Sequence, residues 1–237
     1  GEGKTVSLKG LAKLDELDRL RRDEPRRFCD YCLRDSELVL RILAKTGLDA
    51  LTAKRSALTG VPLELAWTSI PAFERVYAAE LRKRRVVPPP KQDRDVSGAA
   101  GGTVLEPEAG FFSNVLVYDC RSLYPSIMRT FNVDPLAHAR ADRSPQDDDL
   151  VAPNGARFTR SPGVLPAVIT AYAQEREQAL AAGDETAAYV YKILQNSFYG
   201  VLGSPGCRYG RTELAGAITS YGKTFLLAAR GWRRALD

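Results

Sequence analysis

Residues 115–132, VLVYDCRSLYPSIMRTFN, constrain the fold and the chemistry of this chain more than any other segment. The β-branched and aromatic start predicts a short buried strand that ends at the carboxylate of Asp119. Ser122 and Pro125 follow, at the expected start of a helix that runs to about Thr130. A helix N-terminus beside a carboxylate can hold a phosphate, with a divalent cation between the two. Alternatively, Asp119 simply caps a turn between two ordinary elements.

A second segment, YVYKILQNSFYGVLGS from Tyr189 onward, predicts a helix with three polar side chains on one face. Lys192, Asn196 and Tyr199 follow the spacing i, i+4 and i+7, so they lie along one stripe of an otherwise apolar helix. A cation, an amide and a phenol in this arrangement suit a ligand that is both charged and aromatic. The alternative is an amphipathic helix whose polar face only meets water.

Together, D-x-x-S-L-Y-P-S-I from Asp119 and K-x-x-x-N-S-x-Y-G from Lys192 closely resemble the first and second polymerase motifs of family B DNA polymerases. Their order and spacing also fit the family, most closely its bacterial DNA polymerase II branch. Four more segments share the resemblance: YCLRDSELV at 31–39, GGTVLEP at 101–107, GVLP at 163–166 and AIT at 217–219. The resemblance covers nearly the whole chain, although such polymerases are several times longer.

The resemblance implies an α+β fold that is predominantly helical in this fragment. It would be a partial family B polymerase palm with a two-helix fingers hairpin, preceded by the C-terminal helices of a ribonuclease H-like 3′–5′ exonuclease domain. The expected parts are exonuclease helices at 1–47, a helical connector and linker at 48–100, palm with the first motif at 101–164, fingers with the second motif at 165–204, and a palm helix at 205–237. The family's third motif and thumb would lie beyond Asp237, so we expect the isolated fragment to be inactive.

The local pattern of the chain predicts the elements of these parts. Two helices broken near Pro25 occupy the first 45 residues, and residues 48–85 are mainly helical. A strand is expected at 111–119 and a variable loop at 134–161. Two helices at 165–182 and 186–202 form a hairpin, and a long helix begins at 214.

The resemblance also assigns the metal site and the phosphate site. Asp119 is the expected catalytic carboxylate and, with the backbone carbonyl of Cys120, the expected Mg²⁺ ligand, with two ions in the complete enzyme. Lys192 is the second catalytic residue. The expected nucleotide-binding residues are Arg121, Ser122, Leu123, Tyr124, Arg176, Lys192, Asn196 and Tyr199.

Within that set, the resemblance gives each group a role. The N–H groups of Ser122 and Leu123 hold the β and γ phosphates, helped by Arg176 and Lys192. Tyr124 resembles the steric gate that excludes a 2′ hydroxyl, and Asn196 and Tyr199 line the pocket of the nascent base pair. One turn after Arg176 the family often has a further lysine, whereas this chain has Leu180.

The remaining expected sites concern DNA. Gly101, Gly102 and Gly200 are expected to approach the DNA. Tyr31 and Asp35 resemble the third exonuclease motif, as a remnant without the other exonuclease carboxylates. The partners implied are primer–template DNA, deoxynucleoside triphosphates and, for the parent protein, a sliding clamp.

Composition narrows the function classes. With 44% hydrophobic and 27% charged residues, the chain has a globular rather than a disordered composition, and a net charge of +5 permits a polyanionic partner. No apolar run is long enough to predict a membrane span. Four scattered cysteines favour a reducing cytosol. The resemblance implies that this is the bacterial cytosol or nucleoid. The acidic run 147–149 is expected to be solvated in its loop.

We therefore predict template-directed DNA synthesis by two-metal nucleotidyl transfer to a primer 3′ hydroxyl, the activity of a DNA-directed DNA polymerase (a nucleotidyltransferase). The alternative is a non-catalytic nucleic-acid-binding module derived from a polymerase. The joint presence of Asp119, Arg176, Lys192, Asn196 and Tyr199 favours the enzyme. Whether the parent acts in repair or replication stays open.

Overall fold

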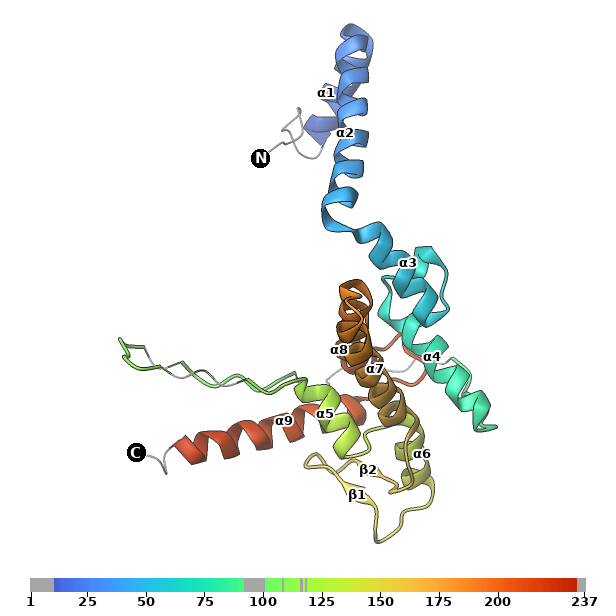
Figure 1. Ribbon diagram of the computed structural model, residues 1–237, viewed down its shortest axis with the longest axis vertical. Coiled ribbons are helices and arrows are strands. Elements are labelled where there is room, and N and C mark those ends of the chain that lie inside the picture. The colour runs from blue at the N-terminus through green and yellow to red at the C-terminus, as the bar shows by residue number, and fades with distance from the viewer. Residues whose placement is uncertain (1–10, 92–100, 108, 116, 118, 234–237) are drawn as a thin grey trace. The chain divides into compact units, whose positions relative to one another are not determined.

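The structure is a computed structural model that describes residues 11–91, 101–107, 109–115, 117 and 119–233. It divides into two compact units, Gly1–Leu51 and Thr52–Asp237. Figure 1 shows the elements of both units with their labels.

The first unit contains two helices, α1 (Leu11–Asp23) and α2 (Pro25–Thr46). Pro25 occupies the first turn of α2, where its missing N–H leaves no hydrogen bond unmade. The helix ends at Gly47, whose φ of 62° is left-handed and whose N–H donates to the carbonyl of Leu43 at 2.8 Å. The expected pair of helices, broken near Pro25, is confirmed.

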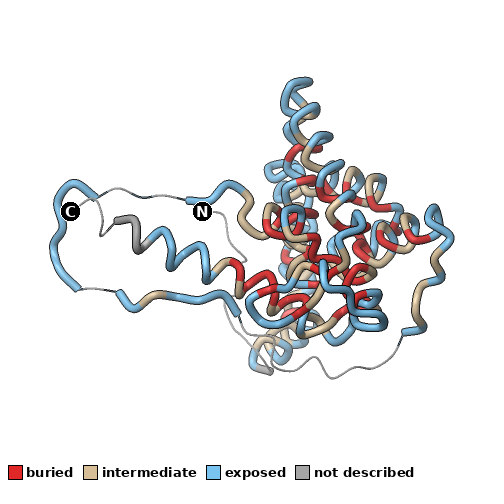
Figure 2. Tube along the Cα trace, turned by 90° about the horizontal axis from the view of Figure 1, so that it is seen from below, coloured by how far each residue is buried: buried red, intermediate tan, exposed pale blue. Residues whose placement is uncertain are grey.

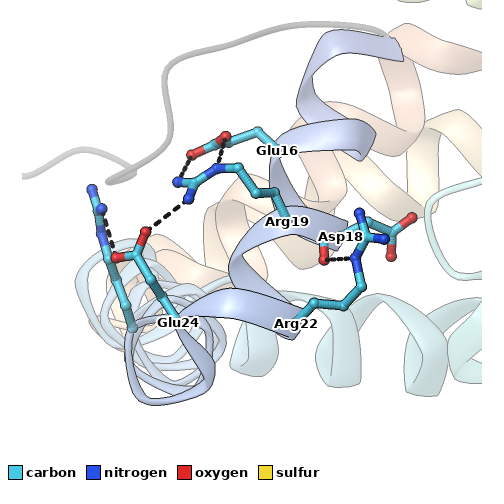
Figure 3. Close-up of polar contacts among 6 residues, drawn as sticks. Glu16, Asp18, Arg19, Arg22 and Glu24 are labelled. Carbon is cyan, nitrogen blue, oxygen red and sulfur yellow. Dashed lines mark hydrogen bonds and ion pairs between the residues drawn. The ribbon is translucent and has the colours of Figure 1, made fainter.

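The corner between α1 and α2 is organised by Arg19, as Figure 3 shows. Its guanidinium donates to both carboxylate oxygens of Glu16, at 2.8 and 2.9 Å, and to Glu24 at 2.9 Å. These hydrogen bonds lower the pKa of both glutamates. Since the groups are accessible to water, they orient the corner more than they stabilise it.

The second unit begins within α3 (Leu48–Thr59), which crosses the boundary between the units. The elements that follow are the 3₁₀ turn η1 (Leu63–Leu65), α4 (Ser69–Lys83), α5 (Leu123–Thr130), α6 (Pro135–Arg143), β1 (Leu150–Val151), β2 (Arg157–Phe158), α7 (Val164–Ala181), α8 (Glu185–Leu202) and α9 (Thr212–Arg233). Among the described residues the only sheet is the antiparallel pair β1–β2, in which Leu150 faces Phe158. The predominantly helical prediction is confirmed.

Helices α7 and α8 pack against each other as a helical hairpin (Figure 1). The turn between them contains Gly183, whose φ of 74° favours glycine. Asp184 caps the start of α8, because its side chain accepts from the N–H of Ala187 at 2.8 Å. The same carboxylate pairs with Lys54 at 2.9 Å. The predicted hairpin is therefore confirmed in its elements and its turn.

An aromatic cluster forms the centre of the second unit. Phe73 of α4 contacts Tyr77 at 5.4 Å, Phe198 of α8 at 5.1 Å and Tyr209 at 6.0 Å between ring centroids. Buried positions of this kind recur along the helices in Figure 2. Offset and edge-on aromatic contacts add to the stabilisation from burial alone, so α4 and α8 are held together firmly.

A buried carboxylate joins three helices of this unit. Asp134 is 0% exposed and precedes α6, where its Oδ2 accepts from the N–H of Ala137 at 2.9 Å. Its Oδ1 accepts from the hydroxyl of Tyr77 on α4 at 2.9 Å and from the N–H of Leu165 on α7 at 2.7 Å. Burial raises the pKa of Asp134, while these donors favour its ionised form. One side chain thus fixes α4, α6 and the base of α7.

Asn132 and Gly163 contact each other beside the Asp134 carboxylate. The side-chain oxygen of Asn132 accepts from the N–H of Gly163 at 2.8 Å. A Cβ at position 163 would lie 2.7 Å from that oxygen and 2.8 Å from the Cβ of Asp134. Only glycine allows the chain to pass this close before α7.

The prediction of a strand at 111–119 is wrong, because none of the residues that the structure describes there belongs to a strand. Val115 and Val117 are 65% and 88% exposed, and neither belongs to a strand. Leu116 and Tyr118 lie outside the described residues. A strand is stabilised by hydrogen bonds to a neighbouring strand, and the local pattern contains no information on whether one is present.

The loop expected at 134–161 is also wrong, because it contains α6, β1 and β2. Within the acidic run 147–149, Asp149 is buried, not solvated. It accepts from the N–H of Gln146 at 2.9 Å and pairs with Arg157 at 3.5 Å. Part of the expected linker, residues 92–100, lies outside the described residues.

No helix in the described part of the chain is long and apolar enough to cross a membrane.

The hydrogen bonds that Asp134 accepts from three helices predict an effect on stability. Asp134→Ala should lower the free energy of unfolding by about 3–5 kcal/mol, because it leaves buried donors from three helices without an acceptor. Urea denaturation of the purified chain, followed by circular dichroism, measures the change.

The matched control is Asp147→Ala, an exposed aspartate in the loop after α6. It should change stability by less than about 0.5 kcal/mol. Equal effects of the two substitutions would contradict the role given to Asp134.

Candidate functional site

The site is built around the start of α5. Ser122 lies at the N-cap position with a left-handed φ of 53°, and its side chain makes no capping hydrogen bond. Ile127 and Met128 are buried and anchor the helix. Helix α5 packs against α7, α8 and α9. Arg121, just before α5, pairs with Glu177 of α7.

A pocket of about 480 Å³ lies between α5 and α7, with one side chain from α8. It brings together three predicted nucleotide-binding residues, Arg121, Ser122 and Arg176. The full lining is Arg121, Ser122, Pro125, Ser126, Arg129, Ile169, Thr170, Ala173, Gln174, Arg176, Glu177 and Gln195. Its size lies within the ordinary range for small-molecule sites.

The polar groups of the pocket are only partly paired. Arg121 donates to the carboxylate of Glu177 at 2.5 Å, and both side chains are exposed. The Nε of Arg176 and the Nε2 of Gln195 are buried without a hydrogen-bond partner among the described residues. Buried donors without acceptors are unfavourable, so the pocket suits a ligand that offers acceptors.

Tyr124 and Tyr199 bring the two motif segments into direct contact. Their ring centroids are 4.4 Å apart with an interplanar angle of 46°. Burial raises the pKa of Tyr199. A Cβ on Gly102 would lie 3.0 Å from the hydroxyl of Tyr124, so glycine there permits the close approach of the 101–107 segment. These two tyrosines and Gly102 therefore form a second local cluster.

Other predicted residues lie outside the pocket. Asp119 and Cys120 are exposed and precede α5, while Lys192 and Asn196 are exposed on α8. None of these four lines the pocket. Leu123 starts α5 and is partly buried.

The predicted DNA-contacting and exonuclease residues are placed as follows. Gly101, Gly102 and Gly200 are exposed in the second unit. In the first unit, Tyr31 is buried beneath Lys13, whose Nζ lies 5.8 Å from the ring centroid, and Asp35 is partly buried on the same helix.

Within the described part of the chain, no group of three or more His, Cys, Asp or Glu side chains is arranged so that it could hold a metal ion. Asp119, with an accessible carboxylate, and the neighbouring Cys120 carbonyl offer oxygen donors of the kind Mg²⁺ prefers. The described residues therefore fit a metal as a partial ligand set.

Sequence reasoning missed several residues that line the pocket. Ser126 and Arg129 follow Ser122 at i+4 and i+7, so helical periodicity could have placed all three on one face of α5. Gln195 had a weaker signal, a polar residue among buried apolar neighbours on α8. Nothing in the sequence pattern indicated the pairing of Arg121 with Glu177.

Comparison with known proteins gives a consistent result. The family described as DNA polymerase family B matches residues 72–232. DNA polymerase II of Escherichia coli (strain K12) is 32% identical over 223 residues, covering 94% of this chain and 28% of that protein. The DNA polymerase of Thermococcus sp. (strain 9oN-7) is 34% identical over 162 residues, covering 61% of this chain and 20% of that protein.

A solved structure shares the fold. The family B DNA polymerase from the hyperthermophilic archaeon Pyrobaculum calidifontis superposes with a TM-score of 0.69 at 26% sequence identity. The match covers 96% of this chain and 30% of the archaeal chain. The chain thus spans less than a third of the length of these relatives.

Proposed function

The chain belongs to DNA polymerase family B, and we propose that it forms part of the nucleotidyl-transfer site of a DNA-directed DNA polymerase. Its substrates are deoxynucleoside triphosphates and primer–template DNA. The observation that carries the proposal is the meeting of the two motif segments. Tyr124 contacts Tyr199 at 4.4 Å, and the pocket beside them joins Arg121 and Ser122 to Arg176.

The proposed chemistry follows from where charge develops. When a primer 3′ hydroxyl attacks the α-phosphate, negative charge grows on the phosphate oxygens and on the leaving group. Arg176 and Lys192 neutralise this charge, and the N–H groups of Ser122 and Leu123 donate to the β and γ phosphates. The Nε of Arg176 supports this role, since it has no acceptor within the part of the chain that the structure describes.

Family B polymerases generally use divalent metals, and we propose two Mg²⁺ ions in the complete enzyme. Asp119 and the Cys120 carbonyl would hold Mg²⁺ together with substrate phosphates, the usual manner for this hard ion. When bound, magnesium stabilises the charge on the phosphates as a Lewis acid.

We assign selectivity for the sugar and the base of the nucleotide to Tyr124 and the residues near it. The ring of Tyr124, packed against Tyr199, excludes a 2′ hydroxyl from the sugar site, and Asn196 and Tyr199 line the nascent base pair. Gly101, Gly102 and Gly200 let the backbone approach DNA. The exposure of all three glycines is compatible with such contacts.

Further proposals concern the parent protein. Tyr31 and Asp35 are a remnant of a proofreading 3′–5′ exonuclease. Residues 48–100 form the helical connector and linker, residues 101–164 the palm with the first motif, and residues 165–204 the fingers. A sliding clamp is a proposed partner, and the cytoplasm is the proposed compartment. The isolated 237-residue chain is proposed not to extend primers.

Binding of a deoxynucleoside triphosphate by the purified chain tests the proposal. Calorimetric titration should show binding that requires Mg²⁺, and Asp119→Asn should weaken this metal-dependent binding because it removes a proposed metal ligand. Arg176→Gln should weaken binding about tenfold or more, because it removes a charge-assisted hydrogen bond. Asp147→Asn and Arg143→Gln are matched controls on exposed sites and should leave the affinity unchanged.

The same titration separates the two function classes. Salt-sensitive DNA binding without any nucleotide binding would favour the non-catalytic module and overturn the enzyme proposal. Metal-dependent nucleotide binding of unchanged affinity in the Arg176→Gln variant would remove the phosphate role of that residue.

Sugar selectivity gives a further prediction. In a polymerase-length protein that contains these residues, Tyr124→Ala should increase ribonucleotide incorporation, because the ring no longer occupies the space of the 2′ hydroxyl. Primer extension with ribonucleotides and deoxynucleotides measures the ratio. Tyr189→Ala, an exposed tyrosine on α8, is the control, and an unchanged ratio in the Tyr124 variant would remove the steric gate.

A further inference from the structure

A second pocket, of about 720 Å³, lies between α3, α4 and α7 and shares no residue with the pocket beside α5. Its lining falls within residues 57–60 at the end of α3, residues 75–83 on α4 and residues 167–172 on α7, and we call it the α4–α7 groove. Figure 1 shows the three helices that form it. None of these residues has a role in the proposed nucleotidyl transfer, so the groove has no function so far.

One face of α4 forms a wall of the groove. Arg75, Ala78, Ala79 and Arg82 line it at positions i, i+3, i+4 and i+7, which lie on one side of a helix. At a rise of 1.5 Å per residue, the two arginines are about 10 Å apart along the helix axis. This face is therefore small in its middle and cationic at both ends.

Helix α7 contributes further small side chains. Ala167 and Ala171 line the groove one turn apart, and both are exposed, as is Ala79 on α4. Between them the buried Val168 adds an apolar contact. The distance of closest approach between helices depends on the side chains at the contact, and alanines allow a close one. The groove therefore suits a third helix with an apolar face.

The two helices that form the groove are firmly fixed. Arg84, at the end of α4, donates to the carbonyls of Pro162 and Gly163 just before α7, at 2.9 and 3.3 Å. Within α7, Tyr172 packs on Tyr191 of α8, with ring centroids 5.3 Å apart. A preformed groove needs no rearrangement to receive a partner, which favours binding.

The charge of the groove indicates the chemistry of the partner. Its cations are Arg75, Arg82 and Lys83, and its single carboxylate, Glu80, pairs with Lys83 at 2.6 Å. The guanidinium groups of Arg75 and Arg82 have no carboxylate partner within the part of the chain that the structure describes. Two unpaired cations at the ends of an apolar face favour a partner with carboxylates at a matching spacing.

We propose that the α4–α7 groove docks an acidic amphipathic helix of another protein. The apolar face of that helix covers the exposed alanines, and two of its carboxylates, seven residues apart, pair with Arg75 and Arg82. DNA fits less well, because contacts to its phosphate backbone would leave the alanine-lined floor uncovered. This inference does not depend on the proposed function.

A synthetic peptide tests the proposal. The probe is a fluorescein-labelled helical peptide of about 18 residues, roughly five turns, with leucines on one face and two glutamates seven residues apart beside that face. Fluorescence anisotropy with the 237-residue chain should show saturable binding, with a dissociation constant below about 1 mM. A peptide of the same composition with its glutamates on the opposite face should bind about threefold more weakly or worse.

Filling the groove should prevent binding. Ala79→Phe places a ring where the peptide would lie and should weaken its binding more than about tenfold, because the ring excludes the partner's apolar side chains. The matched control is Ala53→Phe, at an exposed alanine on α3 outside the groove lining, and it should leave the affinity unchanged. Both variants should keep the helical circular dichroism of the unmodified chain, since both sites are exposed.

Removing the charge gives an independent variant. Arg75→Gln combined with Arg82→Gln should weaken peptide binding about three- to tenfold, because it removes two accessible ion pairs. Arg140→Gln combined with Arg143→Gln on α6 is the matched control outside the groove and should have no effect.

Three results overturn the proposal. The first is the absence of saturable binding, or binding that neither Ala79→Phe nor the paired arginine substitutions weaken. The second is self-association of the chain in sedimentation that Ala79→Phe abolishes, because the occupant would then be a second copy. The third is duplex DNA that displaces the peptide and whose own binding Ala79→Phe weakens, which would make the groove a nucleic-acid surface.

Discussion

The buried carboxylate of Asp134 is the interaction on which the arrangement of the second unit depends. A carboxylate removed from water is unfavourable unless donors surround it, and here the donors come from α4, α6 and α7. Arg84, at the end of α4, adds hydrogen bonds to the carbonyls of Pro162 and Gly163 at 2.9 and 3.3 Å. The base of the α7–α8 hairpin is consequently fixed to the segment that follows α5.

The hydrogen bonds of Asp134 position two motif segments that are far apart in the sequence. Once the base of α7 is fixed beside the end of α5, the hairpin stands over the start of α5, where Tyr124 meets Tyr199. The same packing closes the pocket that holds Arg121, Ser122 and Arg176. Shape and charge at the site thus follow from a structural residue that is not part of the proposed chemistry.

The family, the predominantly helical fold class and most helices could be predicted from the sequence. Helix boundaries are encoded locally, as Pro25, Gly47 and the Gly183–Asp184 turn illustrate. The two motifs predict the family, and the comparisons confirm it. What could not be predicted depends on contacts between distant residues. Asp134 is buried through Tyr77, which lies 57 residues away, and no local pattern encodes such a partner.

The same reason explains the other predictions that the structure contradicts or that missed a residue. The strand before Asp119 was expected from β-branched residues alone, although its formation requires a neighbouring strand. Asp149 was expected in water, but Arg157 on β2 gives it a buried partner. Gln195 belongs to the pocket only because α8 packs on α7, and the sequence does not show which face of α8 that packing covers.

A double-mutant cycle on Tyr124 and Tyr199 measures directly the contact between the two motif segments. Urea unfolding of Tyr124→Ala, Tyr199→Ala and the double variant gives the coupling free energy. We expect a favourable coupling of about 0.5–1.5 kcal/mol, typical of aromatic rings in contact. Effects of the two substitutions that add to within about 0.3 kcal/mol would show that the residues are independent and would contradict a stabilising contact between the segments.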